Sequence, residues 1–196
     1  MKNIKIKLKL RRIISYLLAG VLVSGVAYAA LANKILMKGA SFTTSTVQLK
    51  FLKNLSGGIN SDNLSSQIDG VVFDGILDGW QKDFLVKIVN NSSQNLQVKS
   101  FANYATDQDP ASLRYSLYVE LLPWNDINNN GVYEAGEEGI SLGKKTFVKW
   151  KTEGFDLGTF EPSKSYGYIL RFTSEGITDS KQGANGIFDF EFGVLQ

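Results

Sequence analysis

Three stretches of this 196-residue chain alternate apolar and polar side chains with a period of two, and this alternation constrains the fold most strongly. They are LRYSLYVELL (residues 113–122), SYGYILRFT (residues 165–173) and GIFDFEFGVLQ (residues 186–196). In a β-strand, successive side chains point to opposite faces of the sheet. Each stretch therefore predicts a strand with one buried face and one exposed face.

Five shorter apolar runs also predict strands, and clusters of Gly, Asn, Asp and Ser separate them. These runs are residues 47–51, 71–73, 84–89, 96–101 and 146–150. Beyond the N-terminus, no stretch has the clear 3.6-residue period of an amphipathic helix. About eight short strands joined by polar turns predict an all-β fold, a single antiparallel, jelly-roll-like β-sandwich.

The N-terminus has the layout of a secretory signal peptide. Residues 2–12 hold six basic side chains and no acidic one, a largely apolar run follows, and A-x-A sites end at Ala29 and Ala32. We expect a helical signal peptide over residues 1–29 and a secreted protein at an extracellular or cell-surface location. The alternative is an uncleaved membrane anchor, for which the apolar stretch is marginal in length.

Behind the signal peptide we expect an N-terminal segment, residues 30–40, and one β-sandwich domain, residues 41–196. Removal of residues 1–29 leaves 15 basic against 19 acidic residues and a net charge of −4. Without a basic patch, nucleic acid is not an expected partner. The chain has no Cys and no His, which excludes thiolate catalysis and removes the commonest general base. We therefore predict that the protein is not an enzyme.

The stretch WNDINNNGVYEAGEEGI (residues 124–140) has the spacing of a twelve-residue calcium loop. Gly131 occupies the sixth position, where such a loop bends sharply. Oxygen ligands suit calcium and require neither His nor Cys. We expect one structural calcium ion, bound weakly at about 10⁻⁴–10⁻³ M. The predicted ligands are Asp126, Asn128, Asn130, the carbonyl of Val132, Glu134 and Glu137.

Other interpretations of these residues stay open at this point. The same stretch fits a long polar hairpin loop in which Asn and Asp bond to their own backbone. Its glutamates could form a glycosidase acid–base pair, although nothing in the loop points to a raised pKa. The three tryptophans, Trp80, Trp124 and Trp150, could line a sugar-binding face or belong to a core.

Three further stretches carry a family resemblance. KGASFTTSTVQLKF (residues 38–51) runs from small residues, Thr and Phe into a first strand, and LGTFEPSKSYGYILRF (residues 157–172) sets a Pro-containing turn before an aromatic strand. DSKQGANGIFDFEFGVLQ (residues 179–196) places a Gln-Gly pair before an alternating aromatic strand that ends in Gln. In these features the chain resembles the TasA/camelysin family of secreted biofilm-fibre proteins.

The resemblance implies a jelly-roll subunit that assembles into extracellular fibres, as in the related archaeal bundling pilins. In such fibres the N-terminal segment of one subunit completes the sheet of the next. The implied partners are the chain itself, head to tail, accessory matrix proteins, and a dedicated signal peptidase during export. The metalloprotease classification of camelysins is not carried over, because this chain has no His and no zinc-binding motif.

Two functions therefore remain in competition: a fibre or matrix subunit that assembles by donor-strand β-augmentation, and a monomeric cell-surface module that binds glycan or cell wall. Residues 30–40 favour the first. They carry Leu31, Ile35, Leu36 and Met37, which are too apolar for a free tail. We expect this segment to add to the open sheet edge of a neighbour. The alternative is that it folds back onto its own subunit.

Overall fold

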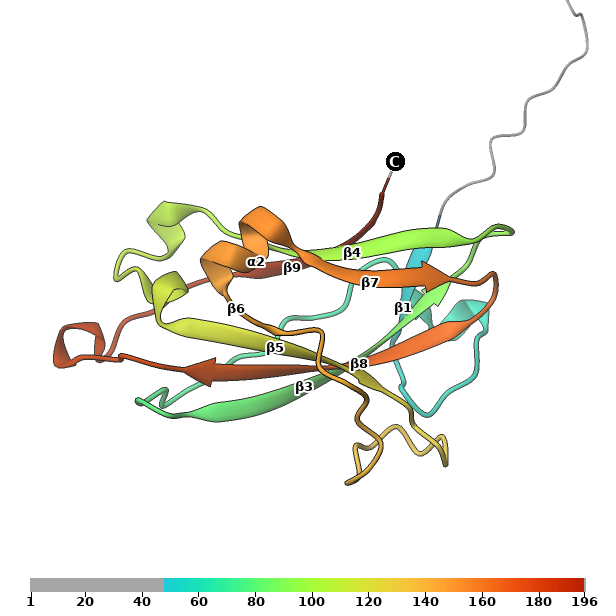
Figure 1. The fold of residues 1–196 in the computed structure, drawn as a ribbon, viewed down its shortest axis with the longest axis horizontal. Coiled ribbons are helices and arrows are strands. Elements are labelled where there is room, and N and C mark those ends of the chain that lie inside the picture. Colours follow the sequence, from blue (N-terminus) through green and yellow to red (C-terminus); the bar gives the residue numbers. More distant parts are fainter. Residues whose placement is uncertain (1–47, 196) are drawn as a thin grey trace, which may run out of the picture. The chain divides into compact units, whose positions relative to one another are not determined.

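Two antiparallel sheets face each other in the computed structural model, which describes residues 48–195 (Figure 1). The larger sheet has the strand order β2-β1-β3-β8-β5-β6 and the smaller one the order β7-β4-β9. The larger sheet comprises β1 (Leu49–Leu52), β2 (Leu64–Ser65), β3 (Gln81–Asn90), β5 (Leu117–Trp124), β6 (Lys144–Thr146) and β8 (Ser165–Ser174). The smaller sheet comprises β4 (Leu96–Asn103), β7 (Phe155–Phe160) and β9 (Asp189–Val194).

The helices of the described residues are short. They are α2 (Phe147–Glu153) and the 3₁₀ helices η1 (Ser61–Asn63), η2 (Thr106–Gln108), η3 (Leu113–Tyr115) and η4 (Asp179–Lys181). None of the helices within residues 48–195 has the length and apolar character needed to cross a membrane. The predicted signal peptide (residues 1–29) and N-terminal segment (residues 30–40) lie outside the described residues.

The three alternating stretches lie in β5, β8 and β9, which confirms the predominantly β character that they predict. The runs at residues 84–89 and 96–101 lie in β3 and β4. β5 begins later than its sequence pattern indicates, because residues 113–115 form the 3₁₀ turn η3. The buried carboxylate of Asp109 fixes that turn, since its Oδ1 accepts the N–H of Leu113 at 2.7 Å.

Two strand predictions are wrong. Of residues 146–150, Thr146 ends the strand β6 and the rest begin the helix α2, because Thr146 Oγ1 accepts the N–H of Lys149 at 3.2 Å and caps the first turn. Phe147 and Trp150, three residues apart, then share one buried helix face. Residues 71–73 form no strand, and Phe73 packs as a single side chain on Trp80 with ring centroids 4.9 Å apart.

The period-two pattern also failed to predict the strands β6 and β7. β6 has only three residues, too few to show a period of two. In β7, Gly158 interrupts the pattern with a φ of +81°, beside an irregularity in the pairing of β4 with β7.

The main core lies between the two sheets, and one end of it is aromatic. Val86 and Ile88 of β3 enter it from the larger sheet, and Val98 of β4 enters it from the smaller. At the aromatic end, the fully buried Trp150 of α2 stacks on Phe190 of β9 with centroids 4.7 Å apart and planes 12° apart. Helix α2 thus holds β9 against the core.

Candidate functional site

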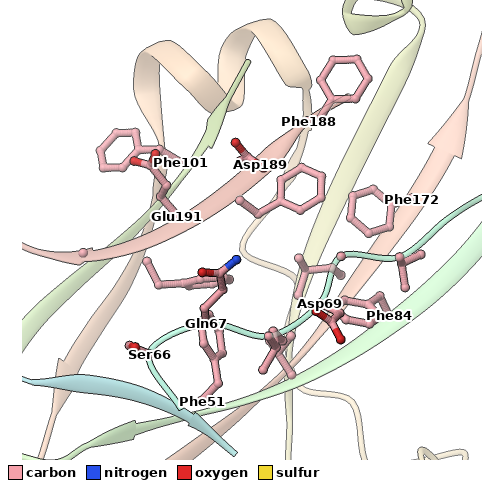
Figure 2. A pocket seen from close by; sticks show the side chains of 18 residues that line it. Phe51, Ser66, Gln67, Asp69, Phe84, Phe101, Phe172, Phe188, Asp189 and Glu191 are labelled. Atoms are coloured by element: carbon pink, nitrogen blue, oxygen red, sulfur yellow. The ribbon is translucent and has the colours of Figure 1, made fainter. Parts of the chain in front are cut away.

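A groove of about 700 Å³ opens beside β9 (Figure 2). One wall is β9 itself, and the opposite wall is the irregular segment of residues 66–71. The floor comes from β3 and β8, which contribute apolar side chains, among them Phe84 and Phe172. At the end near β1, Phe51 and Phe192 meet edge to face with centroids 5.5 Å apart. The groove is therefore apolar at its base and bordered by a strand.

Among residues 48–195, the backbone of β9 has no partner along the side that faces away from β4. β9 lies at the end of its sheet, and β4 is its one partner among the described strands. Leu195 donates its N–H to the carbonyl of Gln97 at 2.9 Å. In an antiparallel pair, the hydrogen-bonded positions recur at every second residue. The N–H groups of Phe190 and Phe192 therefore point away from β4.

The opposite wall of the groove also has free backbone groups. From residue 66 to residue 76, no N–H or C=O makes a backbone–backbone hydrogen bond within the described part of the chain. Gln67 turns its N–H to the Ser65 hydroxyl at 3.2 Å instead. An extended peptide inserted here could therefore pair with β9 on one side and meet free backbone groups on the other.

Three carboxylates border this groove: Asp69, Asp189 and Glu191. No lysine or arginine among the described residues lines it. Its base takes apolar side chains and its border attracts positive charge, so the arrangement suits an apolar, basic segment in extended conformation.

The loop predicted to bind calcium connects β5 to β6 and is closed by its own hydrogen bonds. Asp126 Oδ1 accepts the N–H of Asn130 at 3.0 Å, and Oδ2 accepts the N–H of Gly131 at 2.8 Å. Glu137 Oε1 accepts the N–H of Ile127 at 3.1 Å. Glu137 Oε2 accepts the indole N–H of Trp124 and the N–H of Glu134, both at 3.0 Å. Both buried carboxylates thus have N–H donors on each oxygen.

Three of the other predicted ligands, Asn128, Asn130 and Glu134, are also engaged within the loop. The side-chain oxygens of Asn128 and Asn130 accept the N–H groups of Asn130 and Val132 at 3.0 and 2.7 Å. The carboxylate of Glu134 accepts both Asn side-chain amides, at 3.3 and 2.8 Å. Within residues 48–195, no group of three or more His, Cys, Asp or Glu side chains is placed to hold a metal ion. Calcium at this loop stays a prediction.

The carboxyl groups of Asp126 and Glu137 both have a pKa below its ordinary value. Burial alone would raise the pKa of Asp126, but the Lys87 ammonium and the N–H groups of Gly131 and Asn130 outweigh it. The Trp124 indole is the main cause of the lowered pKa of Glu137, ahead of the opposing effect of burial. Hydrogen bonds therefore favour the carboxylate form of both groups, chiefly the bond from Lys87 at Asp126 and the bond from Trp124 at Glu137.

These lowered pKa values predict that the folded state becomes less stable at acidic pH. A group whose pKa is lower in the folded state stabilises that state above its unfolded pKa, and this contribution is lost as the pH falls through the folded pKa. We expect the free energy of unfolding to fall once the pH drops below about 4, where unfolded Asp and Glu begin to take up protons. Urea unfolding at successive pH values measures this. The Glu137→Gln variant should show a shallower fall, and an equally steep one would contradict the assignment.

The tryptophans do not form a sugar-binding platform. Trp124 and Trp150 are buried, with 4% and 0% of their surfaces exposed. Trp80 is half-buried and packs edge to face on Phe73. The glutamates of the loop are bonded to N–H donors within it, and its buried Glu137 has a lowered pKa, which is the opposite of what a general acid requires.

Sequence reasoning missed one residue of the loop's surroundings. Lys87 lies on β3, far from the loop in sequence, and its ammonium contacts Asp126 at 2.7 Å. The one signal was a lysine inside the apolar run at residues 84–89. A lone lysine in a strand is most often an exposed outer-face residue, so this signal was weak.

Comparison with known proteins adds no relative: no protein-family model matches the chain, and a search of curated proteins finds no match.

Proposed function

We propose that the protein is a secreted structural subunit of extracellular fibres. The N-terminal segment of one subunit, residues 30–40, adds as a strand to the β9 edge of the next subunit. The observation that carries this proposal is the outer edge of β9, which no strand of the described part of the chain pairs, beside an open apolar groove. Soluble proteins usually blunt such an edge, and an added strand satisfies it with backbone hydrogen bonds.

The composition of residues 30–40 supports this occupant. The segment LANKILMKGA (residues 31–40) contains four large apolar side chains, and its charged residues are Lys34 and Lys38. The groove offers an apolar base and three carboxylates at its border. Apolar burial would provide affinity, and the opposite charges would favour the correct register.

The connections between the strands support a jelly-roll-like topology within this proposal. From β3 to β9 the chain changes sheet at every connection except that between β5 and β6. Jelly rolls wind the chain between two sheets in this manner. The same topology would agree with the resemblance to the TasA/camelysin family, which rests on the sequence stretches named above.

The contact is head to tail, because the donor segment and the acceptor groove are different surfaces. A heterologous contact of this kind forms a ring if its rotation closes and an open filament if it does not. A filament of identical subunits needs no further protein for its main contact. Accessory matrix proteins would then start, end or anchor the fibre.

Binding of a synthetic peptide of residues 30–40 to a truncated protein beginning at Ser41 tests the proposal. We expect the peptide to bind and to slow hydrogen exchange at the amides of Phe190 and Phe192 by at least about tenfold. A peptide of the same composition in scrambled order is the control. Binding without protection of these two amides would place the contact elsewhere, and absence of binding would contradict the proposal.

A further inference from the structure

The outer face of the larger sheet carries a small second core that contains a charged side chain. Leu122, Trp124 and Ile169 are its buried members. Lys87 of β3 lies in the same region, since its side chain points opposite to those of Val86 and Ile88, which enter the main core. Only 8% of the surface of Lys87 is exposed. An ammonium so placed destabilises the fold unless it is paired and hydrogen-bonded.

The ammonium of Lys87 has three interaction partners within the described residues. Its Nζ donates to Asp126 Oδ2 at 2.7 Å and to the carbonyl of Leu55 at 2.8 Å. It also lies 5.0 Å from the ring centroid of Trp124. Two hydrogen bonds and one cation–π contact match the three donors of an ammonium group. Lys87 therefore ties β3, the β1–β2 connection and the polar loop together.

The carboxylate that receives this ammonium is the first residue of the twelve-residue loop. Asp126 has a side chain only 2% exposed, so its charge also requires a partner. In a calcium loop that partner is the metal ion. Here a cation from the protein itself is already within hydrogen-bonding distance. A calcium ion entering beside Asp126 would meet the repulsion of the ammonium at close range.

We propose that the Lys87 ammonium is the resident cation of this loop and replaces calcium, so that the loop folds without a metal ion. This inference is independent of the proposed fibre function. It gives Gly131 and the Asn residues of the loop a purely structural role, because their N–H groups close the loop around Asp126.

Thermal unfolding in millimolar calcium and in chelator tests this inference on the unmodified mature protein. We expect the same melting temperature in both, within about 1 °C, since a ligand that does not bind the folded state cannot stabilise it. Titration calorimetry with calcium chloride should show no binding heat. A rise of more than about 3 °C in calcium that the Asp126→Asn variant abolishes would overturn the inference and establish a calcium site.

Variants of Lys87 test whether its ammonium is the cation that stabilises the loop. Lys87→Gln should melt roughly 10 °C lower than the unmodified protein in chelator, because it leaves a buried carboxylate unpaired. Lys82→Gln, on an exposed lysine of the same strand, is the matched control and should melt unchanged. The melting temperature of the double variant Lys87→Gln/Asp126→Asn should fall by less than the sum of the falls in the two single variants. Additive losses, or a Lys87→Gln variant that melts like the control, would overturn the role of Lys87.

Discussion

Replacing Trp150 with Ala is expected to lower the free energy of unfolding by about 3–5 kcal/mol, the cost of removing a large buried aromatic side chain. Trp150 is fully buried, stacks on Phe190 and donates its indole N–H to the Ser100 hydroxyl at 3.0 Å. The substitution leaves a cavity between α2 and β9 and an unpaired hydroxyl on β4. Chemical denaturation of the mature protein measures the loss.

The same substitution should also weaken assembly, since Trp150 supports the strand that carries the acceptor edge. Lys149→Ala is the matched control, because Lys149 is exposed on the same helix and should leave both stability and assembly unchanged. A Trp150→Ala variant that unfolds at the denaturant concentration of the unmodified protein would contradict the packing of α2 on β9.

Replacing Phe192 with Pro is expected to abolish assembly while the subunit still folds. The N–H of Phe192 points away from β4 into the groove, so proline removes no hydrogen bond among residues 48–195. An edge strand can accommodate proline at a position whose N–H points outward. A strand added to this edge would lose the N–H donor of residue 192 and would clash with the proline ring. We expect peptide affinity to fall at least about tenfold, which corresponds to roughly 1.4 kcal/mol.

Phe192→Ala separates the backbone effect from loss of the side chain, whose ring contacts Phe51. The Ala variant should bind the peptide more tightly than the Pro variant, since it keeps the backbone N–H. Circular dichroism establishes that both variants are folded. Equal binding by the two folded variants would show that the β9 edge is not the acceptor.

The strands β5, β8 and β9 could be predicted from the sequence, because the alternation of buried and exposed side chains in a half-buried strand is visible within the strand itself. The runs in β5, β8 and β9 each alternate over at least six residues, which is long enough for a period of two to be visible. Residues 146–150 were too few for a period to be assigned. Their Phe147 and Trp150 satisfy a helical spacing as well, and the capping hydroxyl of Thr146 decides between the two.

The candidate sites were less predictable, because they depend on contacts between distant residues. The polar loop could be found from its spacing, but its partner Lys87 is 39 residues away from Asp126. The groove also depends on contacts between residues that are distant in sequence. β9 could be recognised as a strand, whereas its place at the end of a sheet depends on its pairing with β4, which no local pattern encodes.

Electron microscopy of two purified proteins tests the central claim most directly. One is the mature chain beginning at Ala30, and the other is the truncated chain beginning at Ser41. Assembly by donation of residues 30–40 to the β9 edge predicts fibres from the mature chain and monomers from the truncated chain. Fibres from the truncated chain, or monomers from the mature chain under conditions in which it is folded, would contradict the claim.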